Sequence, residues 1–158
     1  MKIISHRGNL SGPNPATENT VSAIEKCFER KFEVEIDVWF YEGCFWLGHD
    51  TNRAPLPNTF LTTYRDKLWI HAKNIAAAVS LMPLEVNWFW HERDTLTLTS
   101  KGIIWCHHTF IDGGITMLHT ADEVYNLKPN IGGICTDYPE LALKNAYLRP
   151  DNHPQRSL

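Results

Sequence analysis

The sequence predicts an α/β protein built around a mainly parallel β-sheet, and two observations support this fold class. Strand-like and helix-like segments alternate along much of the chain, as they do where helices connect parallel strands. Several apolar runs also end in charge, as in "ISHRG" (4–8), "LGHD" (47–50) and "IHAK" (70–73), and the run "EIDVWF" (35–40) carries two carboxylates. A sheet of this kind that closes on itself forms a (β/α) barrel, in which the C-terminal ends of the strands carry the chemistry.

Apolar periodicity and turn residues define the expected elements. Strands are expected at residues 2–5, 33–40, 44–50, 68–71, 87–92, 95–98, 102–108 and 115–119, and again within "GGICTDYPE" (132–140). Helices are expected from a cap at Asn19 or Thr20 to about Lys31, and at 74–82, 121–127 and 139–147. The segment 8–17, rich in Gly, Pro and Asn, and the segment 51–66, which carries two prolines, are expected to be loops.

The length of the chain limits the size of such a barrel. Barrels of this class usually have about 250 residues, with about 200 at the low end, whereas this chain has 158. Some connecting helices must therefore be lost or reduced to turns, and a small β-hairpin is expected after the second strand, at "YEG" (41–43). We expect one compact barrel domain over residues 1–148 and a polar, flexible tail over 149–158.

Composition argues against several classes of protein. The net charge is −3 and the pI is about 6.2, so there is no basic surface for nucleic acid or for an anionic membrane. No apolar run reaches the roughly 20 residues of a membrane-spanning helix, and the start "MKIISHRGNL" lacks the apolar core of a signal peptide. We therefore expect a cytoplasmic protein without stable membrane insertion. The sequence does not specify its oligomeric state.

The run "EIDVWF" places two carboxylates inside an otherwise apolar strand. Because successive side chains of a strand alternate between its faces, Glu35 and Asp37 share one face, and Val34, Ile36 and Val38 share the other. Inside a closed barrel the acidic face points inward, where two carboxylates repel each other unless a cation lies between them. Both can ligate one divalent ion. The alternative is a half-exposed strand whose acidic face is solvated.

Four further residues at strand ends carry groups suited to phosphate chemistry. His6 and His49 supply imidazoles, whose pKa near neutrality suits general acid–base catalysis. Arg7 offers a guanidinium fork for a phosphate, and Lys73 offers a point charge. Each residue alone is more often structural, but all follow strand-like runs, and in a barrel they would meet at one end.

These segments resemble the glycerophosphodiester phosphodiesterase family, within a superfamily that includes phosphatidylinositol-specific phospholipases C. The matching motifs are "HRG" (6–8), "ENT" (18–20), "EIDV" (35–38), "GHD" (48–50), "IHAK" (70–73) and "GGICTDYPE" (132–140). The resemblance implies a TIM-type barrel, here trimmed, that cleaves a small-molecule phosphodiester with a divalent metal ion as cofactor.

The resemblance also implies roles for individual residues. His6 and His49 would be the acid–base pair, Arg7 and Lys73 would hold the phosphate, and Glu18 would support Arg7 or a ligand. One histidine would take a proton from water or from a neighbouring substrate hydroxyl, and the other would protonate the leaving oxygen. Attack by the hydroxyl would form a cyclic phosphate first.

The chain departs from the family at the metal ligands. The resemblance assigns Glu35 and Asp37 to the metal ion, but the family has a third carboxylate two residues before the lysine, where this chain has His71. Oxygen ligands suit Mg²⁺ or Ca²⁺, whereas a ligating imidazole favours Mn²⁺, Zn²⁺ or a similar ion. Either His71 ligates or water takes its place. The family's substrate-capping insertions are also missing, so we expect an open pocket.

Other polar residues end strand-like runs as well. These are His91, His107, His108 and Asp137. We expect them to be structural residues at the rim of the same barrel mouth, because a single histidine is more often structural than catalytic.

Three functions remain open on the sequence alone. The first is metal-dependent hydrolysis of a glycerophosphodiester-type substrate. The second is a lyase activity like that of phospholipase D toxins, which release a cyclic phosphate from a lysolipid. The third is a non-catalytic phosphate-binding module, although such a module has no need for a pair of proton-transferring histidines.

Overall fold

The computed structural model describes residues 1–107, 109–127 and 131–148. His108 and the predicted tail at 149–158 lie outside the described residues. The strands are β1 (Lys2–His6), β2 (Glu33–Tyr41), β3 (Cys44–Leu47), β4 (Ala54–Leu56), β5 (Leu68–Ala72), β6 (Trp88–Phe89), β7 (Leu96–Leu98), β8 (Ile104–Cys106), β9 (Ile115–Leu118) and β10 (Gly133–Thr136). The helices are α1 (Val21–Glu29), α2 (Asn58–Thr63), α3 (Ile75–Leu81), α4 (Ala121–Tyr125) and α5 (Pro139–Leu148), with a 3₁₀ turn, η1 (Met82–Leu84), after α3.

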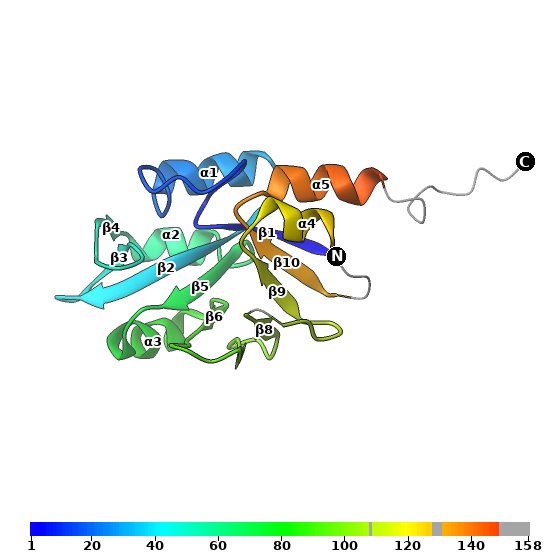
Figure 1. Ribbon diagram of the computed structural model, residues 1–158. Helices are drawn as coiled ribbons and strands as arrows, with labels where there is room; N and C mark the ends of the chain where they lie inside the picture. Colours follow the sequence, from blue (N-terminus) through cyan, green and yellow to red (C-terminus); the bar gives the residue numbers. More distant parts are fainter. Residues whose placement is uncertain (108, 128–130, 149–158) are drawn as a thin grey trace, which may run out of the picture.

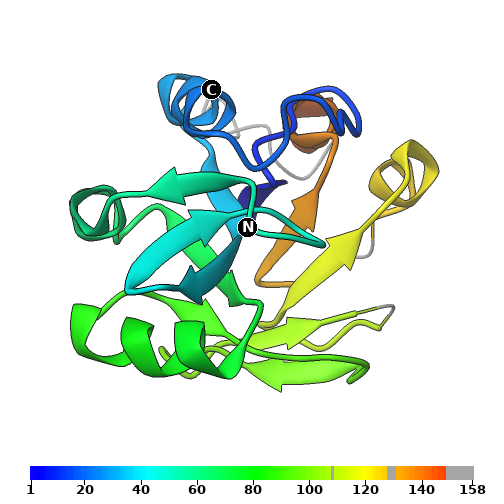
Figure 2. The ribbon, with the colours of Figure 1, turned by 90° about the vertical axis from the view of Figure 1, so that its left-hand side faces the viewer.

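All of these strands belong to one mixed sheet. Neighbouring strands are parallel in the order β6-β5-β2-β1-β10-β9-β8. β7 continues the sheet antiparallel to β8, and β3 and β4 form a hairpin extension on the second half of β2. The sheet curls, and the five helices lie on its outer side (Figures 1 and 2). The predicted, mainly parallel α/β sheet and the small hairpin after the second strand are therefore confirmed.

The sheet does not close, so the expectation of a closed barrel was wrong. Within the described residues, no backbone ladder joins β6 to β7. Instead, the amide of Ser100 donates to the carbonyl of Trp88 at 2.7 Å, and the hydroxyl of Thr97 donates to the carbonyl of Trp90 at 2.9 Å. Of the strand expected at 87–92 only two residues form β6, and β7 runs antiparallel to β8. Among the described strands, none is therefore available to close the sheet by parallel pairing between β6 and β8.

The shortening expected from the chain length falls on one side of the molecule. Helices follow β1, β4, β5, β9 and β10, whereas the described residues contain no helix between β6 and β9. Figure 2 shows this β7–β8 side without a helical cover. In the described part of the chain, no helix is long and apolar enough to cross a membrane.

The segment 51–66 is not a loop, as its two prolines had suggested, but contains β4 and α2. Pro55 is tolerated because β4 is the last strand at its edge of the sheet, where a missing amide hydrogen costs no ladder bond. Pro57 takes the cap position of α2, and Leu61 of that helix is fully buried. Burial of the apolar face of α2 therefore stabilises a helix where the two prolines had indicated a loop.

The apolar and the acidic side chains of β2 lie on opposite faces of the strand, as the alternation predicts. Val34, Ile36 and Val38 are completely buried, in a cluster shared with the helices. Complete burial of such a side chain contributes roughly 1.5–3 kcal/mol. A second cluster, which includes Trp69 of β5 and Trp105 of β8, fills the space that the sheet encloses. These large rings occupy the interior of the small sheet, and the polar end of β2 lies beside them.

Gly8 allows the chain to pass closely over helix α1 after β1. Its φ is +82°, and a Cβ there would lie 3.2 Å from the backbone carbon of Ala23 and 3.2 Å from the nitrogen of Ile24. Gly43, in the β2–β3 turn, has a similar φ of +78° but nothing within 4 Å of its Cβ position. The two glycines therefore share a backbone conformation and differ in packing.

We predict that Gly8→Ala lowers the free energy of unfolding more than Gly43→Ala does. The left-handed backbone costs an alanine about 1–2 kcal/mol at either position, and overpacking against α1 adds about 1–3 kcal/mol at Gly8 alone. Urea unfolding of both variants measures the difference. Equal losses would show that Gly8 has no packing role.

Candidate active site and metal centre

The register of the parallel strands brings the predicted site residues together. His6, the last residue of β1, lies opposite Glu35 of β2, and Asp37 of β2 lies opposite His71 of β5. Because parallel strands point the same way, these side chains meet at one end of the sheet. Asp137 follows directly after β10, the other neighbour of β1, and joins them there.

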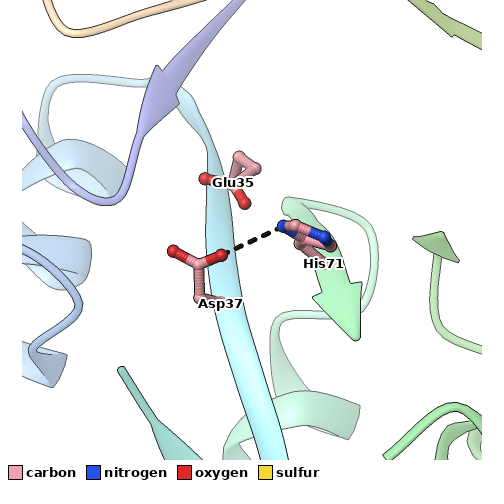
Figure 3. A group of neighbouring side chains, drawn as sticks. All are labelled: Glu35, Asp37 and His71. Carbon is pink, nitrogen blue, oxygen red and sulfur yellow. Dashed lines mark hydrogen bonds and ion pairs between the residues drawn. The ribbon is translucent and has the colours of Figure 1, made fainter. Parts of the chain in front are cut away.

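Glu35, Asp37 and His71 form a candidate metal centre (Figure 3). Each offers a ligand atom, and these atoms all lie within 4.8 Å of one another. Glu35 is 3% exposed and Asp37 is 1% exposed, which rules out the solvated acidic strand. The Oε2 atom of Glu35 is buried and has no hydrogen-bond partner among the described residues. An unsatisfied buried carboxylate oxygen beside a second carboxylate and an imidazole fits a divalent ion.

The two carboxylates differ in their surroundings. Burial, together with the charge of Asp37, raises the pKa of Glu35. Burial acts in the same direction on Asp37, but the hydrogen bond from His71 and the charges of Lys73 and Arg7 outweigh it and hold the pKa of Asp37 well below its usual range. Lys73 Nζ lies 3.3 Å from Asp37 Oδ1, and Arg7 Nε lies 3.0 Å from Asp37 Oδ2.

Asn19 holds Asp37 in place with both ends of its amide. Asn19 Nδ2 donates to Asp37 Oδ2 at 2.9 Å, and Asn19 Oδ1 accepts from the amide of Asp37 at 3.0 Å. Thr20, not Asn19, caps helix α1, because its side chain accepts from the amide of Ala23. The sequence identified Asn19 only as a possible cap, since a short polar residue before a helix signals a cap more strongly than a contact across the sheet.

His6 is paired with Asp137, which lies 131 positions away in the chain. His6 Nδ1 is 2.9 Å from Asp137 Oδ1, and Asn9 Nδ2 donates to the same oxygen at 2.7 Å. His6 Nε2 lies 3.9 Å from Glu35 Oε2. Burial alone would lower the pKa of His6, but the hydrogen bond to Asp137 and the charge of Glu35 raise it.

Asp137 was expected at the rim, and the structure corrects this. It is only 5% exposed, and the hydrogen bonds from His6 and Asn9, with the charge of Arg7, hold its pKa below the usual range against the effect of burial. A partner so distant in sequence leaves no local signal. Its place after a strand-like run and its presence in the "GGICTDYPE" motif were the indications, and neither identifies His6 as its partner.

His49 reaches the same cavity from the loop after β3. The expected strand at 44–50 ends at Leu47, and Gly48 and His49 turn out of it. His49 Nδ1 lies 2.7 Å from Asp50 Oδ1, with side-chain exposures of 39% for His49 and 90% for Asp50. His49 is therefore accessible to solvent, unlike His6, whose side chain is 12% exposed.

One cavity of about 420 Å³ joins these groups. Its lining residues are His6, Arg7, Pro13, Glu35, Asp37, His49, His71, Phe89, His91, Trp105, His107, Met117, His119 and Asp137. Six of the predicted site residues are among them. Lys73 and Glu18 are not in this lining. Lys73 is paired with Asp37, and Glu18 Oε1 accepts from Arg7 Nη1 at 3.2 Å.

The cavity contains six of the eight histidines of the chain. His91 and His107, expected as rim residues, line it together with His119, which the sequence did not single out. Burial and the neighbouring imidazoles of His71 and His107 lower the pKa of His91 to about 3. The imidazole of His91, which stacks on His71, is therefore neutral at physiological pH.

The fold is similar to that of solved glycerophosphodiester phosphodiesterases. One is the glycerophosphodiester phosphodiesterase from Agrobacterium tumefaciens str. C58, with a TM-score of 0.59 and 14% identity, covering 92% of this chain and 99% of that chain. Another is the putative glycerophosphoryl diester phosphodiesterase from Silicibacter pomeroyi DSS-3, with a TM-score of 0.62, 11% identity and 92% coverage of each chain. No family model matches the sequence, and no curated protein matches it significantly. The chain thus has the fold of these phosphodiesterases.

Proposed function

We propose that this protein hydrolyses a phosphodiester of the glycerophosphodiester type. The observation that carries the proposal is that His6, His49, Arg7 and the carboxylate pair of β2 all line one cavity. The substrate class comes from the names of two solved proteins with a similar fold. Proton-transferring imidazoles, a guanidinium and a cation-binding carboxylate pair are the groups that cleavage of a charged phosphodiester needs.

Glu35, Asp37 and His71 would hold a divalent metal ion. When bound, such an ion supplies positive charge that polarises the phosphate and offsets the charge developing on its oxygens. Arg7 contributes charge from the same side of the cavity, because its guanidinium lies between Glu18 and Asp37. These two carboxylates hold the guanidinium in position for a phosphate oxygen.

The two histidines would transfer the protons. The carboxylate of Asp137 accepts the hydrogen of His6 Nδ1, which leaves His6 Nε2 as the nitrogen that exchanges a proton with the substrate. His49, on its exposed loop, is the second imidazole. One of the pair takes a proton from water or from a substrate hydroxyl, and the other gives a proton to the leaving oxygen. Lys73, expected to hold the phosphate, is outside the cavity lining and instead stabilises the ionised state of Asp37.

One prediction from the proposed mechanism concerns the two proposed catalytic histidines. His6→Gln and His49→Gln should each lower kcat by about 10²–10⁴-fold, the usual contribution of a positioned acid or base. The measurement is turnover of bis(p-nitrophenyl) phosphate and of glycerophosphodiesters, with Mg²⁺, Ca²⁺ or Mn²⁺ added to metal-free protein. Thermal melting by circular dichroism shows that the variants are folded.

Phosphorus NMR of the products identifies the reaction. A linear phosphomonoester supports hydrolysis, whereas a cyclic phosphate that persists would indicate the lyase reaction. Undiminished turnover in either histidine variant would overturn the proposed mechanism. The absence of turnover on every diester, together with tight phosphate binding, would indicate a binding module.

Another prediction from this mechanism compares two aspartates that each contact one of these histidines. Asp137→Asn should lower kcat by about 10²-fold while KM changes only a few-fold, because a buried carboxylate orients His6 and stabilises its protonated form. Asp50→Asn should have a much smaller effect, since an ion pair exposed to solvent contributes little. Steady-state kinetics of both variants provide the test. Equal effects would show that Asp137 does not position His6.

A further inference from the structure

The ring of His71 has a defined orientation in the cavity. Its Nε2 lies 3.3 Å from the carbonyl oxygen of His91, and its Nδ1 lies 3.0 Å from Asp37 Oδ1. A carbonyl oxygen can only accept a hydrogen bond, so Nε2 carries a hydrogen. Nδ1 faces the two carboxylates of β2. Without a metal ion it donates its hydrogen to Asp37 Oδ1, and a metal ion bound at Nδ1 would replace that hydrogen.

Aromatic contacts restrict this orientation further. The ring of His71 stacks on Phe89 at a centroid distance of 5.2 Å and an interplanar angle of 9°. It also stacks on the ring of His91 at 4.4 Å and 8°. Phe89 is 1% exposed and belongs to the cluster that fills the inside of the sheet. Packed rings and a main-chain acceptor thus present one nitrogen of His71 to the carboxylates.

We propose that His71 ligates the metal ion through Nδ1, and that the site consequently selects a borderline transition-metal ion over Mg²⁺ and Ca²⁺. This rests on the metal dependence in the proposed function. The donor set is two carboxylates and one imidazole, with Glu35 Oε2 buried and unsatisfied. Imidazole suits Zn²⁺, Fe²⁺ and similar ions, and Mn²⁺ accepts an imidazole beside carboxylates, whereas Mg²⁺ and Ca²⁺ prefer oxygen ligands alone. The His91 carbonyl supplies the outer hydrogen bond that orients a ligating histidine.

The charges around Asp37 favour the same class of ion. Arg7 and Lys73 both lie within ion-pair distance of Asp37, so two positive charges already oppose the negative charges of Glu35 and Asp37. A hard ion that binds by charge alone gains little from a site so nearly neutralised. The lone pair of an imidazole nitrogen gives a transition-metal ion an additional bond.

Pulsed electron paramagnetic resonance tests the ligand directly. Metal-free protein loaded with one equivalent of Mn²⁺ should show coupling to a directly bound imidazole nitrogen. The coupling should disappear in His71→Glu and in His71→Gln. It should persist in His119→Gln, a variant that removes a cavity imidazole outside the ligand set. No coupling in the wild type, or coupling that survives in His71→Glu or in His71→Gln, would overturn the proposal, and either His71 variant suffices if the other fails to fold.

Titration calorimetry tests the selectivity. In the wild type, Mn²⁺ and Zn²⁺ should bind at least tenfold more tightly than Mg²⁺. In His71→Glu the ratio of the Mg²⁺ to the Zn²⁺ dissociation constant should fall by about tenfold or more, and in His119→Gln it should not change. An unchanged ratio in His71→Glu would contradict the proposal. These measurements need no turnover, so a failure of the proposed phosphodiesterase activity would be recognised separately.

Discussion

The burial of two carboxylates side by side on the inner face of β2 is the constraint on which the site depends. A buried charge is costly unless it is paired and hydrogen-bonded. Asp37 meets this requirement with Arg7, Asn19, His71 and Lys73. Glu35 does not, because one of its oxygens has no hydrogen-bond partner in the described chain. This difference between two neighbouring carboxylates is the strongest structural reason to expect a cation.

The small size of the fold is compatible with this site because the connecting helices are missing from the other half of the sheet, in the described residues. The carboxylates and the side chains that pair with them come mainly from β1, β2, β5 and the end of β10, and helices follow three of these four strands directly. The β7–β8 side has no helical cover (Figure 2). Phe89 of β6 and Trp105 of β8 fill the interior together with Trp69 of β5, and His91 and His107 follow β6 and β8 into the cavity. The chain therefore keeps intact the part of the sheet that positions charge.

Patterns local to one strand were predictable from the sequence, and contacts between distant strands were not. The alternation of acidic and apolar residues in β2 predicted that the two carboxylates face inward. The charged ends of the strand-like runs identified His6 and His71 as site residues. The open seam between β6 and β7 was missed, because an apolar run does not reveal whether its neighbour is parallel. Asp137 was underrated because its partner is more than a hundred residues away. The prolines at 55 and 57 suggested a loop, but an edge strand and a helix cap also accept proline.

We infer that one divalent ion lies between the inward side chains of β2 and β5. A crystal structure of the protein with Mn²⁺, with anomalous diffraction measured above the manganese edge, tests this most directly. We predict a single strong anomalous peak in contact with carboxylate oxygens of Glu35 and Asp37 and with Nδ1 of His71, at roughly 2.0–2.3 Å. A peak elsewhere, or no peak while Asp37 remains paired with Arg7 and Lys73, would contradict the account.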